Sequence, residues 1–224
     1  MTLSVRQLAA YGLMGAPLAM AALPVYVLAP KLYGDELSMS LGLLGLVLFA
    51  ARLIDTLQDP WLGRLVDRWQ HRPHGWRVLL LLGAVLLALG FVALFAPPAL
   101  SELGLAFWLA ASLVLAYSAH SLINVCYLAW GARISDQPAQ RSRVTGWREA
   151  AGLGGVLLAS ILPFVLVQYL PPADARALFS LLFVVLLLLG LWSLLCRAPV
   201  ARIESALASP SWWWSSSPRR PRSR

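Results

Sequence analysis

Charged residues are scarce in this sequence. Only 12% of its 224 residues are charged, whereas 59% are hydrophobic and the mean hydropathy is +0.71. A water-soluble domain of this length would need far more polar side chains to cover its surface, which excludes that class. Cysteine is scarce as well, because only Cys126 and Cys196 are present. They provide no disulfide framework of the secreted type, and we interpret both as small apolar side chains.

Strand-like alternation is also missing, and long apolar runs take its place. A membrane β-barrel would show short segments that alternate between apolar and polar residues, so this architecture is disfavoured. An α-helix needs about 20 apolar residues to cross a hydrocarbon layer of roughly 30 Å. Six such runs predict an all-α membrane protein, a six-helix bundle over residues 1–200. The predicted spans lie near residues 8–30, 40–62, 76–96, 104–130, 144–170 and 175–196.

The charges that remain are distributed unevenly between the loops. If the N-terminus is cytoplasmic, the outer loops contain only two basic residues, Lys31 and Arg176, and the arginine-rich loops lie on the inner side. This is the distribution that the positive-inside rule describes. We therefore predict an integral protein of the plasma membrane, the inner membrane in a bacterium, with both termini in the cytoplasm. The net charge of +8 then indicates membrane lipids, and not nucleic acid, as neighbours.

The second predicted span carries charged residues inside the membrane. Arg52, Asp55 and Asp59 share one helix face, and Gln58 lies slightly off it. Each ionisable group at this depth costs at least about 2.5 kcal/mol. Two ionised carboxylates one turn apart repel, so either one holds a proton or both share a cation such as Na⁺. The alternative is a structural ion pair between Arg52 and one aspartate.

The fourth predicted span has a polar face of its own. Four residues lie on it: Tyr117, His120, Ser121 and Asn124. By counting along both helices, we expect Ser121 at the depth of Asp55 and Asn124 at the depth of Asp59. Polar groups from two helices at one level are typical of a midplane transport site. The alternative is that they only join helices by hydrogen bonds, worth about 0.6 kcal/mol each.

The fifth predicted span begins with an arginine, Arg148, near the inner surface. Its guanidinium either reaches the lipid headgroups or turns inward as a hydrogen-bond donor to a solute. Three glycines follow, Gly152, Gly154 and Gly155. Small residues in a membrane helix permit close packing against a neighbouring helix, so we expect this part of the span to contact another one tightly.

Three segments together resemble one family of membrane transporters. They are LFAARLIDTLQDPWLGRLVDR in the second span, SLINVCYLAWGARISD in the fourth and RSRVTGWREAAG at the start of the fifth. Over roughly residues 5–200 the chain resembles the N-terminal half of the glycoside–pentoside–hexuronide:cation symporters of the major facilitator superfamily. The resemblance implies one half of a major facilitator fold. It includes the G-x-x-x-D-R pattern of the loop after the second helix. Structural or gating roles are assigned to Arg52, Gly63, Asp67 and Arg68. Of these, Gly63 is expected to allow close helix approach.

The resemblance also implies two binding sites. The positions that match the cation site are Asp55, Gln58, Asp59 and Ser121, with Na⁺ or H⁺ as the coupling ion and no other cofactor. The sugar site would take an acid from the first helix, an acid from the fourth and an arginine from the fifth. Ala19 and Asn124 stand at the two acidic positions, which makes a solute other than a galactoside the expectation. The residues assigned to substrate binding are Tyr117, His120, Asn124 and Arg148.

We therefore expect a cation-coupled secondary transporter of a small solute, sugar-like or otherwise polar or amphipathic. Because such transporters have two six-helix halves, the sequence is interpreted as a truncated N-terminal half. One hypothesis is a frameshift after about residue 205, and the other is pairing with itself or with a second half-transporter. Residues 201–224 are predicted to form a disordered cytoplasmic tail. The alternative function is that of a non-transporting helical membrane protein or a degenerate fragment. Enzyme activity is not expected.

Overall fold

The computed structural model describes residues 3–69, 72, 74–135 and 137–198. Within these residues all regular secondary structure is helical. The elements are α1 (Val5–Gly12), α2 (Gly15–Lys31), the π-helix η1 (Leu32–Glu36), α3 (Leu41–Trp69), α4 (Gly75–Phe95), α5 (Glu102–Ala132), α6 (Pro138–Tyr169) and α7 (Pro172–Arg197). The predicted tail, residues 201–224, lies outside the described residues.

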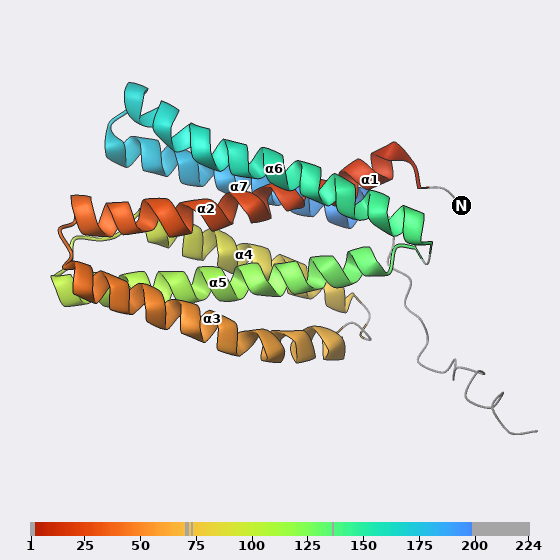
Figure 1. Ribbon diagram of the computed structural model, residues 1–224, viewed down its shortest axis with the longest axis horizontal. Coiled ribbons are helices and arrows are strands. Elements are labelled where there is room, and N and C mark those ends of the chain that lie inside the picture. Colours follow the sequence, from red (N-terminus) through yellow and green to blue (C-terminus); the bar gives the residue numbers. More distant parts are fainter. Residues whose placement is uncertain (1–2, 70–71, 73, 136, 199–224) are drawn as a thin grey trace, which may run out of the picture.

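The described residues contain six stretches that are long and apolar enough to cross a membrane. The first combines α1, α2 and η1, and each of α3 to α7 supplies one more. The predicted six-helix, all-α membrane protein is therefore confirmed. The helices lie side by side, with α3 and α6 at opposite edges and α2 and α5 between them (Figure 1). We call the end of the bundle near the N-terminus the N-terminal end and the opposite one the far end.

Two helices are longer than the hydropathy of the sequence predicts. Helix α3 continues to Trp69 instead of ending near residue 62, and α6 begins at Pro138 instead of near residue 144. Hydropathy marks only the apolar part of a helix, whereas backbone hydrogen bonds continue the helix into polar sequence. Pro138 can start α6 because a proline at the first helical position sacrifices no hydrogen bond. The polar positions of both helices thus lie on continuous, rigid elements.

The first span is interrupted, although the sequence predicts a single helix. Helix α1 ends at Gly12 and α2 begins at Gly15. Beside the break, the Tyr127 hydroxyl donates a hydrogen bond to the carbonyl oxygen of Tyr11 at 2.8 Å. The Tyr11 hydroxyl donates in return to the carbonyl oxygen of Tyr127 at 3.0 Å. Leu13 and Met14 between the two helices keep right-handed helical dihedral angles, so α1 and α2 still belong to one membrane-crossing stretch, Val5–Glu36.

Small residues and aromatic rings fill the interior. A Cβ atom on Gly90 of α4 would come within 2.9 Å of the backbone nitrogen of Ala116, so α4 and α5 approach closely only because position 90 is glycine. Between α4 and α7 the rings of Phe91 and Phe183 stack, with centroids 3.9 Å apart. Both cysteines are free, Cys126 in the interior and Cys196 at the surface.

The glycines of α6 differ in what they contact. A Cβ atom on Gly155 would overlap the carbonyl oxygen of Ala16 in α2, whereas one on Gly154 would meet no atom within 4 Å. Gly152 has room for an ordinary contact, 3.7 Å from the side chain of Ala19. The predicted close packing of α6 is therefore real, but it depends on one of the three glycines.

Helices α3 and α6 are the least covered of the spans. Only 17% of the most apolar stretch of each is buried, compared with 61% for the first span. Both helices carry charged residues along their exposed length, such as Arg52 in α3 and Glu149 in α6. The edges of the bundle are therefore where its membrane-embedded charges lie.

Candidate functional site

Helices α3 and α5 carry most of the candidate residues, and their register is set at the far end of the bundle. There the backbone nitrogen of Ser40 donates a hydrogen bond to Glu102 Oε1 at 2.9 Å. Asp59 lies 19 residues after Ser40, and Ser121 lies 19 residues after Glu102. Because both helices rise about 1.5 Å per residue, Asp59 and Ser121 reach the same depth.

The Ser121 hydroxyl contacts Asp59 directly. Ser121 Oγ donates a hydrogen bond to Asp59 Oδ1 at 2.5 Å. The predicted register, which places Ser121 level with Asp55, is therefore wrong by one helical turn. Hydropathy locates the helix starts only roughly, whereas the Ser40–Glu102 contact fixes them. Among the residues that the structure describes, Asp59 forms no ion pair.

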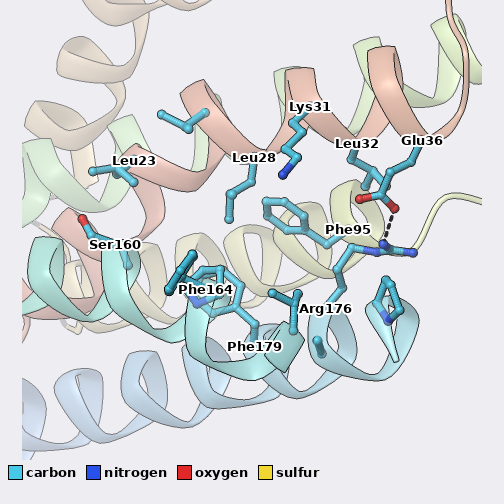
Figure 2. Close-up of a pocket in the computed structure, with 16 residues that line it drawn as sticks. Leu23, Leu28, Lys31, Leu32, Glu36, Phe95, Ser160, Phe164, Arg176 and Phe179 are labelled. Atoms are coloured by element: carbon cyan, nitrogen blue, oxygen red, sulfur yellow. Dashed lines mark hydrogen bonds and ion pairs between the residues drawn. The ribbon is translucent and has the colours of Figure 1, made fainter. Parts of the chain in front are cut away.

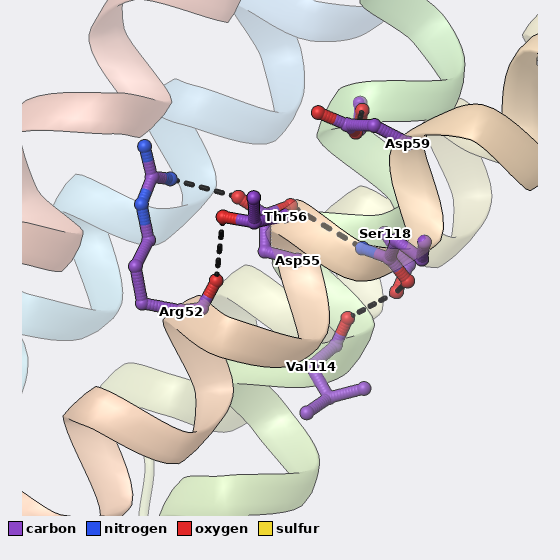
Figure 3. A network of polar contacts seen from close by, with 8 residues as sticks. Arg52, Asp55, Thr56, Asp59, Val114 and Ser118 are labelled. Atoms are coloured by element: carbon purple, nitrogen blue, oxygen red, sulfur yellow. Dashed lines mark hydrogen bonds and ion pairs between the residues drawn. The ribbon is translucent and has the colours of Figure 1, made fainter.

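Asp55 has different partners (Figure 3). Arg52 Nη1 donates to Asp55 Oδ2 at 2.7 Å, and Gln58 Nε2 donates to Asp55 Oδ1 at 3.2 Å. Gln58 in turn accepts a hydrogen bond from Ser118 Oγ at 2.6 Å. The Asp55 side chain is only 13% exposed. Of the two aspartates, Asp55 therefore has its charge balanced within α3, and the open question of an Arg52 ion pair is answered in favour of Asp55.

The guanidinium of Arg52 also lies beside two aromatic rings. It is 5.7 Å from the ring centroid of Tyr26 in α2 and 6.0 Å from that of Tyr117 in α5. A cation at about 6 Å from an aromatic face gains roughly 0.5–1 kcal/mol at an exposed site. Arg52 thus connects three helices, and this contact places Tyr117 at the edge of the site.

A cavity of about 280 Å³ lies beside these contacts, between α2, α3, α4 and α5. We call it the polar cavity. The predicted residues that line it are Arg52, Asp55, Asp59, Tyr117, His120, Ser121 and Asn124. Gln58 acts on the polar cavity through its hydrogen bond to Asp55 and is not part of the lining. The structure therefore gathers residues from the second and fourth predicted spans around one space.

A second space of about 230 Å³, the arginine cavity, adjoins the polar cavity between α2, α5 and α6. It shares His120 and Asn124 with the polar cavity and adds Arg148 and Ala19. His120 Nε2 lies 3.1 Å from the carbonyl oxygen of Leu18, which ties α5 to α2. Arg148 is three-quarters buried and pairs with Glu149. The three positions that the family resemblance implies for solute binding, 19, 124 and 148, therefore come together here.

The residues assigned to structure or gating beyond Arg52 lie toward the end of α3. Asp67 and Arg68 are exposed in its last turn. A Cβ atom on Gly63 would meet no atom within 4 Å among the described residues. The expectation that Gly63 allows close helix approach is therefore not met among the described residues.

Sequence reasoning missed two residues of the site. Tyr26 lines the polar cavity and faces Arg52, but a tyrosine in an apolar run gives no signal of its own. Ser118 supports Gln58, and here a signal existed: it precedes Ser121 by three residues and so shares its helix face. Neither position could be given a role before the register of α3 and α5 was known.

The arrangement can hold one small cation at Asp59. The carboxylate and the Ser121 hydroxyl provide oxygen atoms, which are the ligands that hard cations prefer. Two side chains are fewer than the several oxygens that a metal cation takes, so Na⁺ would need further oxygens from water. A proton needs only the carboxylate. Asp55 is less suited, because Arg52 already occupies its carboxylate.

Comparisons with known proteins agree with this architecture. The model of one family, described as MFS/sugar transport protein, matches residues 8–209. The chain belongs to this family. The MFS, or major facilitator superfamily, consists of transporters, and a bundle of six spanning helices is one half of its fold. The predicted fold class, family and absence of enzyme function are thereby confirmed.

Curated relatives of this MFS/sugar transport chain are symporters by name. The inner membrane symporter YicJ of Escherichia coli (strain K12) is 29% identical over 136 residues, which are 61% of this chain and 30% of YicJ. YagG of the same organism, named as a glycoside/cation symporter, is 28% identical over 144 residues, 64% of this chain and 31% of YagG. The symporter YnaJ of Bacillus subtilis (strain 168) is 29% identical over 134 residues. The matched region spans about 30% of the length of these relatives.

Proposed function

We propose that this chain provides the cation-binding helices of a secondary transporter that couples a small polar solute to H⁺ or Na⁺. The observation that carries the proposal is the Ser121–Asp59 hydrogen bond beside a second carboxylate, Asp55, whose charge Arg52 already balances. An ionised Asp59 inside a membrane costs at least about 2.5 kcal/mol on insertion scales. Binding of a cation at Asp59 neutralises the carboxylate and removes that cost, so cation binding is favoured.

The solute binds in the arginine cavity under this proposal. Arg148 donates hydrogen bonds or a positive charge, and Asn124 and His120 add groups that both donate and accept. His120 and Asn124 also line the polar cavity, so a bound solute lies next to the cation site. Adjacent sites of this kind allow the occupancy of one to change the affinity of the other. A sugar-like solute agrees with the name of YagG, and the amide and methyl at positions 124 and 19 favour one other than a galactoside.

A second helical unit is expected to cover the exposed charges. The side chains of Arg52 and Glu149 are 57% and 62% exposed, at a depth where lipid would otherwise surround them. Such charges face protein or a water-filled cavity in membrane proteins. We propose that another copy of this chain or a second half-transporter packs against α3 and α6.

The proposed orientation places the N-terminal end of the bundle in the cytoplasm, in a bacterial inner membrane. Four arginines stack on tryptophans at that end: Arg64 on Trp61, Arg72 on Trp69, Arg133 on Trp76 and Arg197 on Trp192. Tryptophan and arginine together are typical of the headgroup level, and an excess of arginine is typical of the cytoplasmic side. The name of YicJ supports the inner membrane.

The function is tested by uptake into proteoliposomes that contain the wild-type chain, under an imposed Na⁺ or H⁺ gradient and with a panel of radiolabelled sugars and sugar acids. We expect accumulation of at least one solute that stops when the gradient is collapsed with an ionophore. Asp59→Asn should abolish it, because the amide cannot take up a proton or balance a cation.

Asp35→Asn is the matched control, since Asp35 is an exposed carboxylate in η1 that lines neither cavity. It should leave uptake unchanged. Gradient-driven uptake that survives Asp59→Asn would contradict the proposal. If no solute accumulates with wild-type protein of verified fold, alone or with a co-expressed second half, the chain is a non-transporting membrane protein.

A further inference from the structure

A cavity of about 440 Å³ lies away from the proposed transport site, at the far end of the bundle. It lies between α2, η1, α6 and α7, and Phe95 at the end of α4 closes its base (Figure 2). Leu23, Leu28, Phe164 and Phe179 make its walls, and most of the lining is apolar. We call it the apolar cavity. Its volume falls within the range of about 300–1,000 Å³ that is usual for sites of small molecules.

Charged side chains stand at one side of the apolar cavity. Lys31, the only lysine of the chain, ends α2, and its amine points toward the cavity beside Leu28 and Phe95 (Figure 2). Arg176 in the first turns of α7 donates from Nη1 to Glu36 Oε2 at 2.6 Å. Two cations and one carboxylate therefore line the rim, which leaves one positive charge in excess.

Two donors of this rim are unused. The side-chain amine of Lys31 forms no hydrogen bond or ion pair with any residue that the structure describes. Arg176 Nε is buried and has no hydrogen-bond partner among the described residues, although the same guanidinium binds Glu36 through Nη1. A buried donor without a partner is unfavourable. An anion at this position could accept from Nε without breaking the pair with Glu36.

The chemistry of the apolar cavity fits a molecule with an apolar body and an anionic head. A polar solute would leave its hydroxyl groups unpaired against the leucine and phenylalanine walls, which is unfavourable. The charges lie at the end of α2 and the start of α7, where membrane helices reach the headgroup level and lysine and arginine extend toward phosphates. A bilayer supplies such molecules at high concentration.

We propose that the apolar cavity is a binding site for one phospholipid, with an acyl chain between α2, α6 and α7 and the phosphate against Lys31 and Arg176. The site is separate from the proposed transport site, because none of its lining residues belongs to the polar or the arginine cavity. Glu36 weakens the site, because its negative charge partly neutralises Arg176 beside the phosphate position.

The test is native mass spectrometry of the purified full chain in detergent with added phosphatidylglycerol. We expect one phosphatidylglycerol per chain to stay bound. Diacylglycerol, which has the same acyl chains but no phosphate, should bind at least about tenfold more weakly. Lys31→Gln should weaken phosphatidylglycerol binding about tenfold as well. Glu36→Gln should strengthen it, because it removes the negative charge that partly neutralises Arg176. Arg64→Gln, an exposed arginine at the other end of the bundle, should have no effect.

A second measurement uses the single lysine. Acetylation of Lys31 by an amine-reactive reagent, followed by peptide mass spectrometry, should slow when phosphatidylglycerol is added and not when diacylglycerol is added. Ser160→Phe places a ring in the cavity without changing charge and should remove this protection, with melting temperature and gel filtration as the check that the variant folds.

Three outcomes would overturn the proposal. The first is equal binding of phosphatidylglycerol and diacylglycerol with no effect of Lys31→Gln, which would make the cavity a non-selective apolar groove. The second is protection of Lys31 that Ser160→Phe leaves intact, since the lipid would then touch only the rim. The third is a dimer that buries Lys31 in place of lipid, seen as a doubled mass and loss of acetylation without added lipid.

Discussion

Helix α2 takes part in two cavities whose chemistry is opposite. Through Ala22 and Tyr26 it lines the polar cavity of about 280 Å³, where carboxylates, hydroxyls and a guanidinium meet inside the spans. Through Leu23, Leu28 and Lys31 it lines the apolar cavity of about 440 Å³, whose charges lie only at the rim. Leu23 follows Ala22 by one position, which rotates its side chain by about 100° around the helix and toward the other cavity.

The difference shows how the position of a charge decides its meaning in a membrane protein. A carboxylate such as Asp59, deep in a span, carries a solvation cost that only a bound cation, a proton or a basic partner can relieve. A lysine such as Lys31, at a helix end, reaches the headgroups at little cost. The first kind of charge therefore implies an ion site, and the second implies a lipid contact.

The largest effect is expected at the hydroxyl that distinguishes the polar cavity. Ser121→Ala removes one of the two protein oxygen ligands of the proposed cation site and should weaken Na⁺ binding about 10- to 100-fold, a loss comparable to the ~1.5–3 kcal/mol of a hydrogen bond to a charged group. Equilibrium binding of radioactive Na⁺ to the purified chain measures this. Ser118→Ala, one turn earlier on α5, is the matched control because Ser118 contacts Gln58 and not Asp59. Equal effects of the two substitutions on Na⁺ binding would show that the Ser121 hydroxyl is not a ligand of the cation.

Helices α2 and α6, which together line the arginine cavity and the apolar cavity, pack closely at Gly155. Gly155→Ala would push a methyl group against the carbonyl oxygen of Ala16 and should cost about 1–3 kcal/mol of stability, as overpacking does. Gly154→Ala meets no neighbour and should stabilise α6 by up to ~1 kcal/mol through helix propensity. Thermal unfolding in detergent compares the pair. Similar melting temperatures for the two variants would mean that α6 does not pack on α2 at Gly155.

The smallest effect is expected at the ion pair between Arg52 and Asp55. Arg52→Gln leaves Asp55 without its basic partner and should cost about 1–2 kcal/mol, below the ~3–5 kcal/mol of a fully buried pair, because the Arg52 side chain is 57% exposed. The double variant Arg52→Gln/Asp55→Asn should recover most of the loss. A double variant no more stable than Arg52→Gln alone would argue that the pair does not balance Asp55. Thermal unfolding of the single and double variants completes the cycle.

The polar cavity was largely predictable from the sequence. Spacings of three and four residues place Arg52, Asp55 and Asp59 on one face of a helix, and a charge inside an apolar run is a strong signal. The pairing of Asp59 with Ser121 was not predictable, because it depends on the register between α3 and α5. That register follows from the contact between Ser40 and Glu102, which hydropathy does not report.

The apolar cavity was not predictable from the sequence. Leu23, Phe164 and Phe179 come from three helices, and each is an ordinary apolar residue of a membrane span. Whether such residues fill a core, face lipid or leave a cavity depends on how far the helices diverge at the far end. Lys31 and Arg176 were recognised only as the basic residues of the outer loops, since their shared rim requires the fold.

The central claim is that Asp59 binds the coupling ion while Arg52 balances Asp55. Infrared difference spectroscopy of the purified chain tests it most directly, by recording carboxyl bands when Na⁺ is added or the pH is stepped through neutrality. The account predicts a carboxyl change in response to at least one of these steps that persists in Asp35→Asn and vanishes in Asp59→Asn. Identical difference spectra for wild type and Asp59→Asn under both steps would contradict it.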